Sequence, residues 1–262
     1  MNRHERRKAA AMSAPNPGGG TKVWLGIPNH DGGMKCLTVN SLLHDAFYLF
    51  NRGDMVYPFT ELGHADLYLL RAQICARFLE DKGATDLVMI DNDVGWGPLG
   101  LVRLLDHENV DIVAGAYSKR SDPLRFMWRS EVAGTLKGDA NTGLMDVLGM
   151  PGGFMRIRRE VLEKMVEHYR EELGAADQSV EGSPSYVVRL FDPYWYVHDG
   201  KRMALSEDYA FCQRAIDMGF TVKMDAAIPM AHIGSKAWKG CVLEHMQPND
   251  VAKEDSENVE AA

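Results

Sequence analysis

The stretch DLVMIDNDVGW, residues 86–96, joins an apolar run to an acidic triplet. The apolar residues Leu87–Ile90 predict a buried strand that ends at Asp91, Asn92 and Asp93. In an extended chain the side chains at positions i and i+2 point the same way, so both carboxylates are expected to face one cation. Their oxygens suit magnesium, manganese or calcium. These residue types also favour ordinary turns after strands, and the spacing alone leaves both interpretations open.

Strands and helices alternate around this stretch. Strands are expected at Val23–Ile27, Met55–Phe59 and Val110–Ala116, and helices at Leu37–Asn51, at Ala65–Glu80 and from near Pro98. This succession favours an α/β fold, in which helices flank both faces of a mainly parallel, Rossmann-like sheet. Ligands bind at the carboxyl ends of the strands in such sheets, which is where the triplet lies.

The second half of the chain is less regular. Strands are expected at Gly152–Arg158, Tyr186–Phe191 and Phe220–Met224, and helices at Glu160–Glu172 and Glu207–Met218. No repeat or linker interrupts residues 21–245, which favours one domain. Residues 1–20 are expected to form a flexible basic arm and residues 246–262 a flexible acidic tail.

Composition and charge argue against several classes of protein. With 45% hydrophobic and 25% charged residues among 262, the chain is typical of a soluble globular protein. The 29 basic and 37 acidic residues give a net charge of -8, which disfavours a protein that coats duplex nucleic acid. Four separated cysteines without a CxxC pair predict reduced thiols and no structural zinc. No signal segment is visible and no apolar run approaches the ~18 residues of a membrane span, so we expect a cytoplasmic protein.

A second acidic pair lies later in the chain. Ser206 precedes Glu207 and Asp208 at the expected start of a helix, where a serine can cap free amides and carboxylates meet the positive end of the helix dipole. Such acids are often no more than helix-start chemistry. Here the helix leads into a strand and then into AHIG, residues 231–234, so one module connects the acidic pair to His232.

Taken together, these pieces resemble the GT-A nucleotide-diphospho-sugar glycosyltransferases, particularly inverting family 2-like, phage-encoded or bacterial members. The similarity covers roughly residues 23–234. The segments that carry it are VWLGIP with Pro28, LLRAQICARFLE with Arg71, DLVMIDNDVGW, GGFMRIRREVL at 152–162, SEDYAFCQRAIDMGF at 206–220, and AHIG. The resemblance implies a GT-A fold whose less regular second half faces the acceptor.

The resemblance also implies a nucleotide-diphosphate-sugar donor and a divalent metal, Mn²⁺ or Mg²⁺. Asp93 would bind the metal that bridges the two donor phosphates, and His232 would complete its coordination. Asp91 would contact the ribose or a metal-bound water. The implied donor-binding residues are Pro28, Arg71, Asp91, Asn92 and Asp93.

The same resemblance implies a base for an inverting transfer to an acceptor hydroxyl. Asp208, with Glu207 as second choice, would take the hydroxyl proton, a role that suits a carboxylate whose pKa is raised by burial. The expected sugar or acceptor contacts are Gly152, Gly153, Trp195 and Tyr196. Glycines let the backbone approach a ligand closely, and aromatic faces suit sugar rings. An ordinary turn and packing under a loop are the competing interpretations.

Some features depart from the family or leave the substrates open. Ala72 stands where relatives often have asparagine, and neither Asp54 nor Glu61 clearly matches the acid that reads the base, so the nucleobase is not assigned. The acceptor is a glycan, a lipid, a protein or a modified nucleic-acid base. A basic patch for nucleic acid, or for an acceptor loop, would consist of Lys119, Arg120, Arg125 and Arg129.

Two other classes compete with the transferase. A haloacid-dehalogenase-type phosphatase also has two aspartates separated by one residue, but on its first strand, whereas about 90 residues precede Asp91 here. A sugar nucleotidyltransferase would need a glycine-rich, arginine-bearing first loop, which VWLGIPNHDGG is not. The second competing class is not an enzyme. It is a GT-A-like module that binds a nucleotide or a sugar without catalysis, since a fold alone does not prove that a protein catalyses a reaction.

Overall fold

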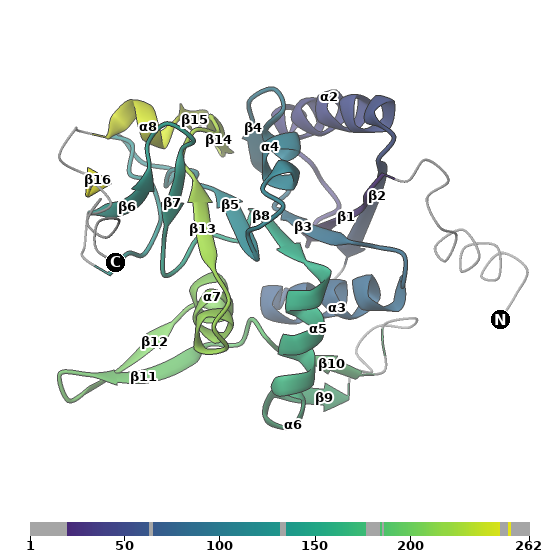
Figure 1. Cartoon of the computed structure of the whole chain (residues 1–262), viewed down its shortest axis with the longest axis vertical. Coiled ribbons are helices and arrows are strands. Elements are labelled where there is room, and N and C mark those ends of the chain that lie inside the picture. Colours follow the sequence, from purple (N-terminus) through teal and green to yellow (C-terminus); the bar gives the residue numbers. More distant parts are fainter. Residues whose placement is uncertain are drawn as a thin grey trace, which may run out of the picture.

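Within the described residues, nine strands form a central sheet with helices on both faces (Figure 1). The computed structural model describes residues 20–62, 65–131, 135–176, 184, 186–246 and 251–252. The strand order is β16 (Val251–Ala252), β6 (Leu136–Asp139), β7 (Leu144–Asp146), β13 (Val222–Asp225), β5 (Ile112–Gly115), β8 (Phe154–Arg158), β3 (Asp86–Ile90), β1 (Lys22–Asn29) and β2 (Met55–Leu62).

Most strands of this sheet point the same way. β1 is parallel to β2 and β3, β13 is parallel to β5, and β16 is parallel to β6. β8 is antiparallel to both β3 and β5, and β7 is antiparallel to both β13 and β6. Of the nine described strands, only β7 and β8 are therefore reversed. The predicted α/β fold with a mainly parallel sheet is confirmed.

The helices cover the two faces of the sheet. One face carries α2 (Cys36–Arg52) and α4 (Gly100–Asp106), and the other carries α3 (Leu67–Glu80), α5 (Arg159–His168) and α7 (Glu207–Asp217) (Figure 1). Side chains alternate between two apolar cores because successive strand residues face opposite sides. In β3, Val88 packs in the core that contains Leu49 of α2, whereas Leu87 packs in the core that contains Ile74 of α3.

Smaller elements surround the sheet. β4 (Val94–Trp96), β14 (Met230–Ile233) and β15 (Ala237–Gly240) form a three-stranded sheet. β9 (Gly174–Ala176) pairs with β10 (Tyr186–Val188), and β11 (Tyr194–His198) with β12 (Lys201–Leu205). Two short helices, α6 (Arg170–Leu173) and α8 (Val242–His245), complete the described elements.

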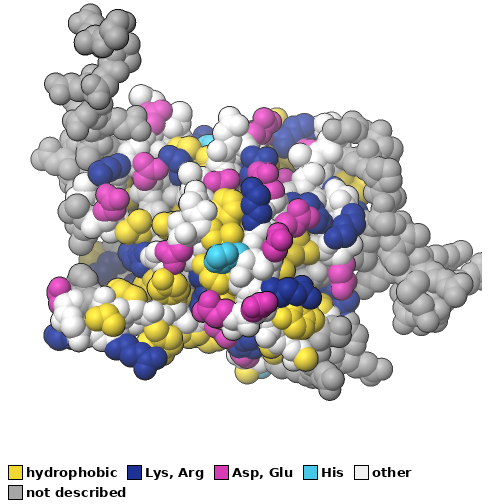
Figure 2. Space-filling view, turned by 60° about the horizontal axis from the view of Figure 1, so that its bottom comes forward, with side chains coloured by type: hydrophobic (Ala, Val, Ile, Leu, Met, Phe, Trp, Pro, Cys, Tyr) yellow, Lys and Arg dark blue, Asp and Glu magenta, His cyan; other side chains and the backbone are white. Residues whose placement is uncertain are grey.

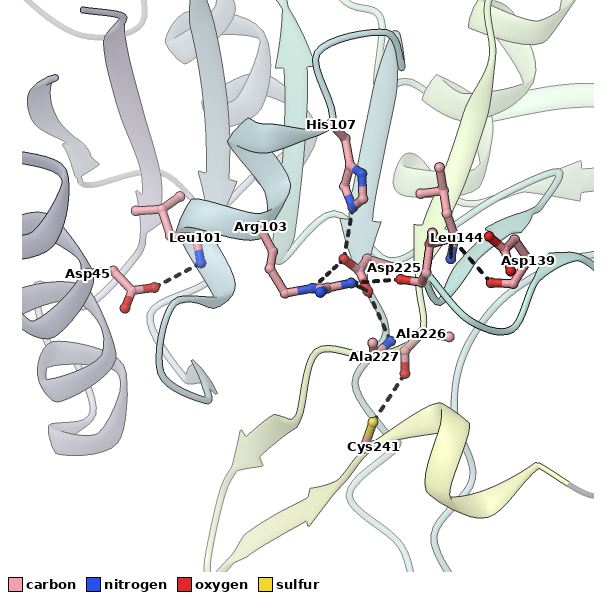
Figure 3. Close-up of polar contacts among 11 residues, drawn as sticks. Asp45, Leu101, Arg103, His107, Asp139, Leu144, Asp225, Ala226, Ala227 and Cys241 are labelled. Atoms are coloured by element: carbon pink, nitrogen blue, oxygen red, sulfur yellow. Dashed lines mark hydrogen bonds and ion pairs between the residues drawn. The ribbon is translucent and has the colours of Figure 1, made fainter. Parts of the chain in front are cut away.

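A buried carboxylate on α2 organises the start of α4. Asp45 is fully buried and accepts hydrogen bonds from the backbone amides of Leu99 at 2.8 Å and of Leu101 at 2.9 Å, the second of which is drawn in Figure 3. It also accepts one from Trp96 Nε1 at 2.9 Å. The free amides at the beginning of α4 are thus satisfied by a neighbouring helix, which ties the two helices together.

A second buried carboxylate connects the first half of the chain to the last strands. Asp225 at the end of β13 accepts hydrogen bonds from Arg103 Nε at 2.8 Å and from the Ala227 amide at 3.0 Å, and His107 Nε2 lies 2.9 Å from it (Figure 3). Although burial alone would raise the pKa of Asp225, the bonds from His107 and Arg103 hold it below the ordinary value.

The element positions differ from the predictions at a few points. Pro98 precedes α4, which begins at Gly100 after Leu99, a residue with φ 63°. The helix expected over Glu160–Glu172 is divided into α5 and α6 at Tyr169. The predicted arm lies outside the described residues apart from residue 20. Of the predicted tail, residues 246 and 251–252 are described, and the latter pair form β16.

Candidate active site

Five segments bring polar residues to one edge of the sheet. Asp91 follows the carboxyl end of β3, and Tyr117 is the second residue after the end of β5. Because β8 runs against both neighbours, its beginning, after Gly153, lies at the edge where they end, and the Asp91 amide donates to Gly153 O at 3.0 Å. The first turn of α7 adds Asp208, and β14 adds His232. The sequence correctly placed the triplet at a strand end, where ligands bind in such sheets.

The acidic triplet is a turn, not extended chain. The Val94 amide donates to Asp91 O at 3.2 Å, which closes the turn. The premise that Asp91 and Asp93 lie in extended chain is therefore wrong, because i, i+2 spacing aligns side chains only in a strand; that both face one cation stays a prediction. Asp91 forms an ion pair with Arg71, and Asp93 forms one with Arg120.

Arg71 lies beneath the site and holds two carboxylates. Its side chain on α3 is only 1% exposed, and its Nη2 lies 3.1 Å from Asp91 Oδ1 and 3.4 Å from Asp208 Oδ1. Nη1 donates to Gly152 O at 3.2 Å, and the guanidinium lies 5.6 Å from the centre of the Phe191 ring. Burial would lower the pKa of Arg71, but Asp208 and Asp91 raise it above its usual value. All these contacts are with protein groups, so direct donor binding by Arg71 stays a prediction.

Asp208 is a largely buried carboxylate with an incomplete set of partners. Its side chain is 14% exposed, and Oδ1 accepts no hydrogen bond from the described residues. Burial raises the pKa of Asp208 to about 6, opposed by Arg71 and by a hydrogen bond from the Gly152 backbone, and reinforced by Asp91. A carboxylate with this pKa is ionised at neutral pH and is still basic enough to accept a proton.

The start of α7 differs in one detail from the prediction. Ser206 is the N-cap residue, but its side chain makes no capping hydrogen bond, so the expected serine cap is wrong. Glu207 and Asp208 both lie in the first turn, as predicted. Within the described residues, the Arg71 ion pair is formed by Asp208 and not by Glu207.

Two glycines allow the backbone to pass close to these groups. A Cβ on Gly152 would lie 2.5 Å from Asp208 Oδ1, and one on Gly153 would lie 2.4 Å from Asp91 Oδ2. Neither carboxylate could keep its position beside a larger residue. The glycines are therefore required by the site itself, whether or not a ligand also approaches them.

Tyr117 belongs to the site although the sequence did not single it out. Its hydroxyl donates to Asp91 Oδ2 at 3.3 Å, and its ring meets the His232 ring edge-on at 4.9 Å between centres. Burial, with Asp91 and Asp208 nearby, raises the pKa of Tyr117 well above its ordinary value. The sequence could have indicated Tyr117 as a site residue, because it directly follows the predicted strand Val110–Ala116. That strand ends at the same edge of the sheet as the acidic triplet.

Asp93 and His232 lie side by side. The imidazole donates from Nδ1 to Ser118 O at 2.8 Å, and burial lowers the pKa of His232, which favours a neutral ring with its lone pair on Nε2. Nε2 lies 3.9 Å from Asp93 Oδ1. Arg120 forms an ion pair with the other oxygen of Asp93.

This pair fits a divalent ion in its donor chemistry. Metal-binding histidines commonly donate their second nitrogen to a backbone carbonyl, as His232 does to Ser118. A carboxylate and an imidazole suit manganese, with phosphate and water as the other ligands. The described part of the chain contains no group of three or more His, Cys, Asp or Glu side chains arranged to hold a metal. Asp91 contacts Arg71 and Tyr117 instead, so its predicted role as metal ligand gains no support.

A cleft of about 360 Å³ opens beside the triplet. It is lined by Pro28, by His30 and Asp31, and by residues 91–93. Pro28 lies inside β1, opposite Glu61 of β2, rather than after the strand as the sequence suggested. Asn92 Nδ2 donates to Gly33 O at 2.8 Å, so its amide fastens the loop after β1 to the cleft.

The two aromatic candidates lie on the β11–β12 hairpin, which extends away from the sheet (Figure 1). Trp195 is 56% exposed, and Arg202 of β12 stacks on its ring at 4.3 Å. Tyr196 is its neighbour in β11 and pairs with Met203. β12 ends three residues before Asp208, so the hairpin lies next to the site along the chain. Among the described residues, no hydrogen bond or ring contact joins Trp195 or Tyr196 to Asp208, and their acceptor role stays a prediction.

The predicted basic patch is not a free surface. Arg120 is paired with Asp93, and Arg129 donates to Gln213, which leaves Lys119 and Arg125 exposed. On the face shown in Figure 2, basic and acidic side chains are interspersed. This distribution gives no support to a continuous track for a nucleic-acid backbone. None of the described helices has the length and apolar character to cross a membrane.

Comparisons with known proteins bear on the fold. No protein-family model and no curated protein matches the sequence. The crystal structure of A197 from STIV is similar to 91% of this chain and 100% of that chain, with 16% identity and a TM-score of 0.51. A glycosyltransferase involved in the glycosylation of the major capsid of PBCV-1 covers 58% of this chain and 67% of its own, with 14% identity and a TM-score of 0.32. The first similarity shows a shared fold alone, and the second is too low to support an argument.

Proposed function

We propose that this α/β protein is a metal-dependent glycosyltransferase, which moves a sugar from a nucleotide-diphosphate-sugar to an acceptor hydroxyl with inversion. The observation that carries the proposal is Asp208. It is a largely buried carboxylate with a pKa of about 6, linked through Arg71 to Asp91 on the wall of the cleft. The spatial grouping of Asp93 with His232, and of Gly152 and Gly153 with the carboxylates, adds to the resemblance of the sequence motifs.

The proposed reaction is a single in-line displacement. The acceptor oxygen forms a bond to the anomeric carbon while the bond from that carbon to the diphosphate oxygen breaks, and the electron pair leaves with the diphosphate. Asp208 takes the hydroxyl proton as the oxygen attacks. Arg71 and Gly152 hold the carboxylate in place, because both contact it from the protein side.

Asp93 and His232 are the residues that would hold the metal. A divalent ion, Mn²⁺ or Mg²⁺, would offset the charge that builds up on the departing diphosphate. The nucleoside would lie in the cleft against Pro28 and Asn92. The acceptor would approach past Gly152 and Gly153, with Trp195 and Tyr196 as platforms. Its chemical class is left open among a glycan, a lipid, a protein and a modified nucleic-acid base.

A thermal-shift panel tests the proposal. Uridine, guanosine and thymidine diphosphates and their sugars are each added with and without Mn²⁺, to the wild type and to Asp93→Ala. A ligand at ~100 times its dissociation constant stabilises by ~2.7 kcal/mol, which is readily measured. We expect a Mn²⁺-dependent shift with one base that is lost in the variant, followed by slow release of the nucleoside diphosphate from the matching sugar.

The other outcomes separate the competing classes. A nucleotide shift without consumption of any nucleotide-sugar, with candidate acceptors of all four classes present, indicates a binding module. No nucleotide shift, with phosphate released from a generic phosphomonoester, indicates a phosphatase. Either result contradicts glycosyl transfer.

A further inference from the structure

The carboxylate at the proposed metal position already has a cationic partner. Arg120 forms an ion pair with Asp93 Oδ2, while Asp93 Oδ1 lies 3.9 Å from His232 Nε2. The guanidinium therefore neutralises the same carboxylate that a divalent ion would use. The Arg120 side chain is 42% exposed, so it has room to turn away from Asp93.

The chain around Arg120 is fastened to the β14–β15 turn. Ser118 forms a β-bridge with Phe126, and Asp122 forms an ion pair with Lys236 between the two strands. A Cβ on Gly234 would lie 3.0 Å from Arg120 Cδ, so the aliphatic part of the arginine passes directly over that glycine. These contacts anchor the backbone of the segment and leave the guanidinium as its movable part.

The same segment contains donors without partners. Ser118 Oγ, Ser121 Oγ and Trp238 Nε1 are buried and make no hydrogen bond with the described residues. Trp238 pairs with His232 across β14 and β15, and its ring lies beside Gly234 under Arg120. Buried donors without partners are costly. The segment around Arg120 is therefore not fully satisfied by hydrogen bonds within the described protein.

We infer that Arg120 competes with the divalent metal for Asp93 in the nucleotide-free protein and transfers to the diphosphate when the donor binds. The inference rests on the proposed function. Two cations on the two oxygens of one small carboxylate repel each other, so the guanidinium on Oδ2 weakens metal binding at Oδ1 and the metal weakens the ion pair. A diphosphate offers Arg120 a stronger, charge-assisted partner. Metal and donor therefore bind together, and the metal alone binds weakly.

The test measures Mn²⁺ binding to the full chain without nucleotide, from the loss of the free Mn²⁺ signal in electron paramagnetic resonance. Arg120→Ala is expected to bind Mn²⁺ about fivefold more tightly than the wild type, because it removes a half-exposed competing ion pair. Arg125→Ala removes the same charge from the same segment but leaves Asp93 untouched, so its Mn²⁺ affinity is expected to equal that of the wild type. In Arg120→Ala combined with Asp93→Ala the gain disappears.

Pyrophosphate tests the second half of the inference. In the presence of Mn²⁺, Arg120→Ala is expected to bind pyrophosphate about tenfold more weakly, and Arg120→Lys to recover most of the loss. An unchanged Mn²⁺ affinity in Arg120→Ala, or a gain that persists without Asp93, contradicts the competition. Unchanged pyrophosphate affinity contradicts the transfer. If Arg120→Ala binds Mn²⁺ more tightly but the wild type consumes no nucleotide-sugar, the competition is supported and glycosyl transfer is contradicted. If the wild type consumes a nucleotide-sugar but Arg120→Ala shows no gain in Mn²⁺ affinity, glycosyl transfer is supported and the competition is contradicted.

Discussion

At the scale of single residues, Asp208 differs from the buried carboxylates Asp45 and Asp225 in how its charge is compensated. Both oxygens of Asp45 and of Asp225 accept hydrogen bonds. Asp208 has Arg71 at 3.4 Å and an oxygen without a hydrogen bond. The negative charge of Asp208 is therefore incompletely compensated, which favours protonation of this carboxylate. A general base requires such a tendency to accept a proton.

The first prediction concerns activity. Asp208→Asn is expected to lower turnover by about 10²–10⁴, because the proton then has no carboxylate to accept it. In the wild type, kcat/KM should rise with pH through a pKa of about 6, and this limb should be absent from the variant. The pH profile of nucleoside diphosphate release measures both effects. Glu207→Gln is the matched control and should lose much less turnover. An equal loss of turnover in both variants would contradict the assignment of Asp208 as the base.

The second prediction concerns stability. The folded pKa of Asp208, about 6, lies above the ordinary value of 3.8, so the folded state binds more protons than the unfolded state between pH 4 and 6. The protonated Asp208 carboxyl therefore favours the folded state at acid pH, and the free energy of unfolding falls as the pH rises through 6. Asp208→Asn should be more stable than the wild type by roughly 2 kcal/mol at pH 8 and equally stable near pH 4. Urea unfolding at the two pH values checks this, and a variant less stable at pH 8 refutes it.

At the scale of elements, a side chain from a distant segment decides where α4 begins. The sequence predicted that Pro98 would open a helix, but α4 begins at Gly100 because Asp45 holds the amides of Leu99 and Leu101. Likewise Ser206 begins α7 without using its hydroxyl. Local capping preferences therefore located the start of α7 at Glu207 correctly, but placed the start of α4 two residues too early.

The third prediction follows from the Asp45 contacts. Asp45→Ala should destabilise the fold by about 2–4 kcal/mol, because it leaves two helix-start amides and the Trp96 indole without a buried acceptor. Asp106→Ala is the control, because it removes an exposed carboxylate near the other end of α4 and should cost less than about 0.5 kcal/mol. Urea denaturation compares the two variants, and equal costs would show that the Asp45 bonds do not stabilise the helix start.

At the scale of the whole molecule, burial on both faces of the sheet determines which groups meet solvent. Cys75 and Cys212 lie in the core between the sheet and α3, α5 and α7, whereas Cys36 at the start of α2 is exposed. All four thiols are free, as the spacing of the cysteines predicted. Burial raises the pKa of both Cys75 and Cys212 to about 12, and it also raises that of Cys241. Only Cys36 is thus accessible for thiolate chemistry in the native state.

The fourth prediction is a thiol count. Ellman's reagent should react rapidly with one thiol per native molecule and with four after denaturation in guanidinium, without added reductant. Cys36→Ser should abolish the rapid native reaction. Rapid reaction of a second thiol would contradict the burial of Cys75, Cys212 and Cys241, and fewer than four thiols after denaturation would indicate a disulfide.

The sequence by itself determined the alternation of strands and helices, the α/β class and the placement of the acidic triplet at a strand end. These follow from local periodicity, because each apolar residue reports which face of its own element is buried. Arg71, Asp91 and Asp208, which the resemblance named as candidate site residues, lie together in the structure, and their roles stay predictions.

Only the tertiary structure decided how those residues are paired. The reversed direction of β8 brings Gly152 and Gly153 against the carboxylates. Asp91 contacts Arg71 and Tyr117. Asp93 forms an ion pair with Arg120 and lies beside His232. The partners are 20 to 139 positions apart in the chain, so no local pattern encodes them. Hydrogen bonding and charge neutralisation in a buried site depend on which segments the packed sheet brings to one edge, and that is a property of the whole fold.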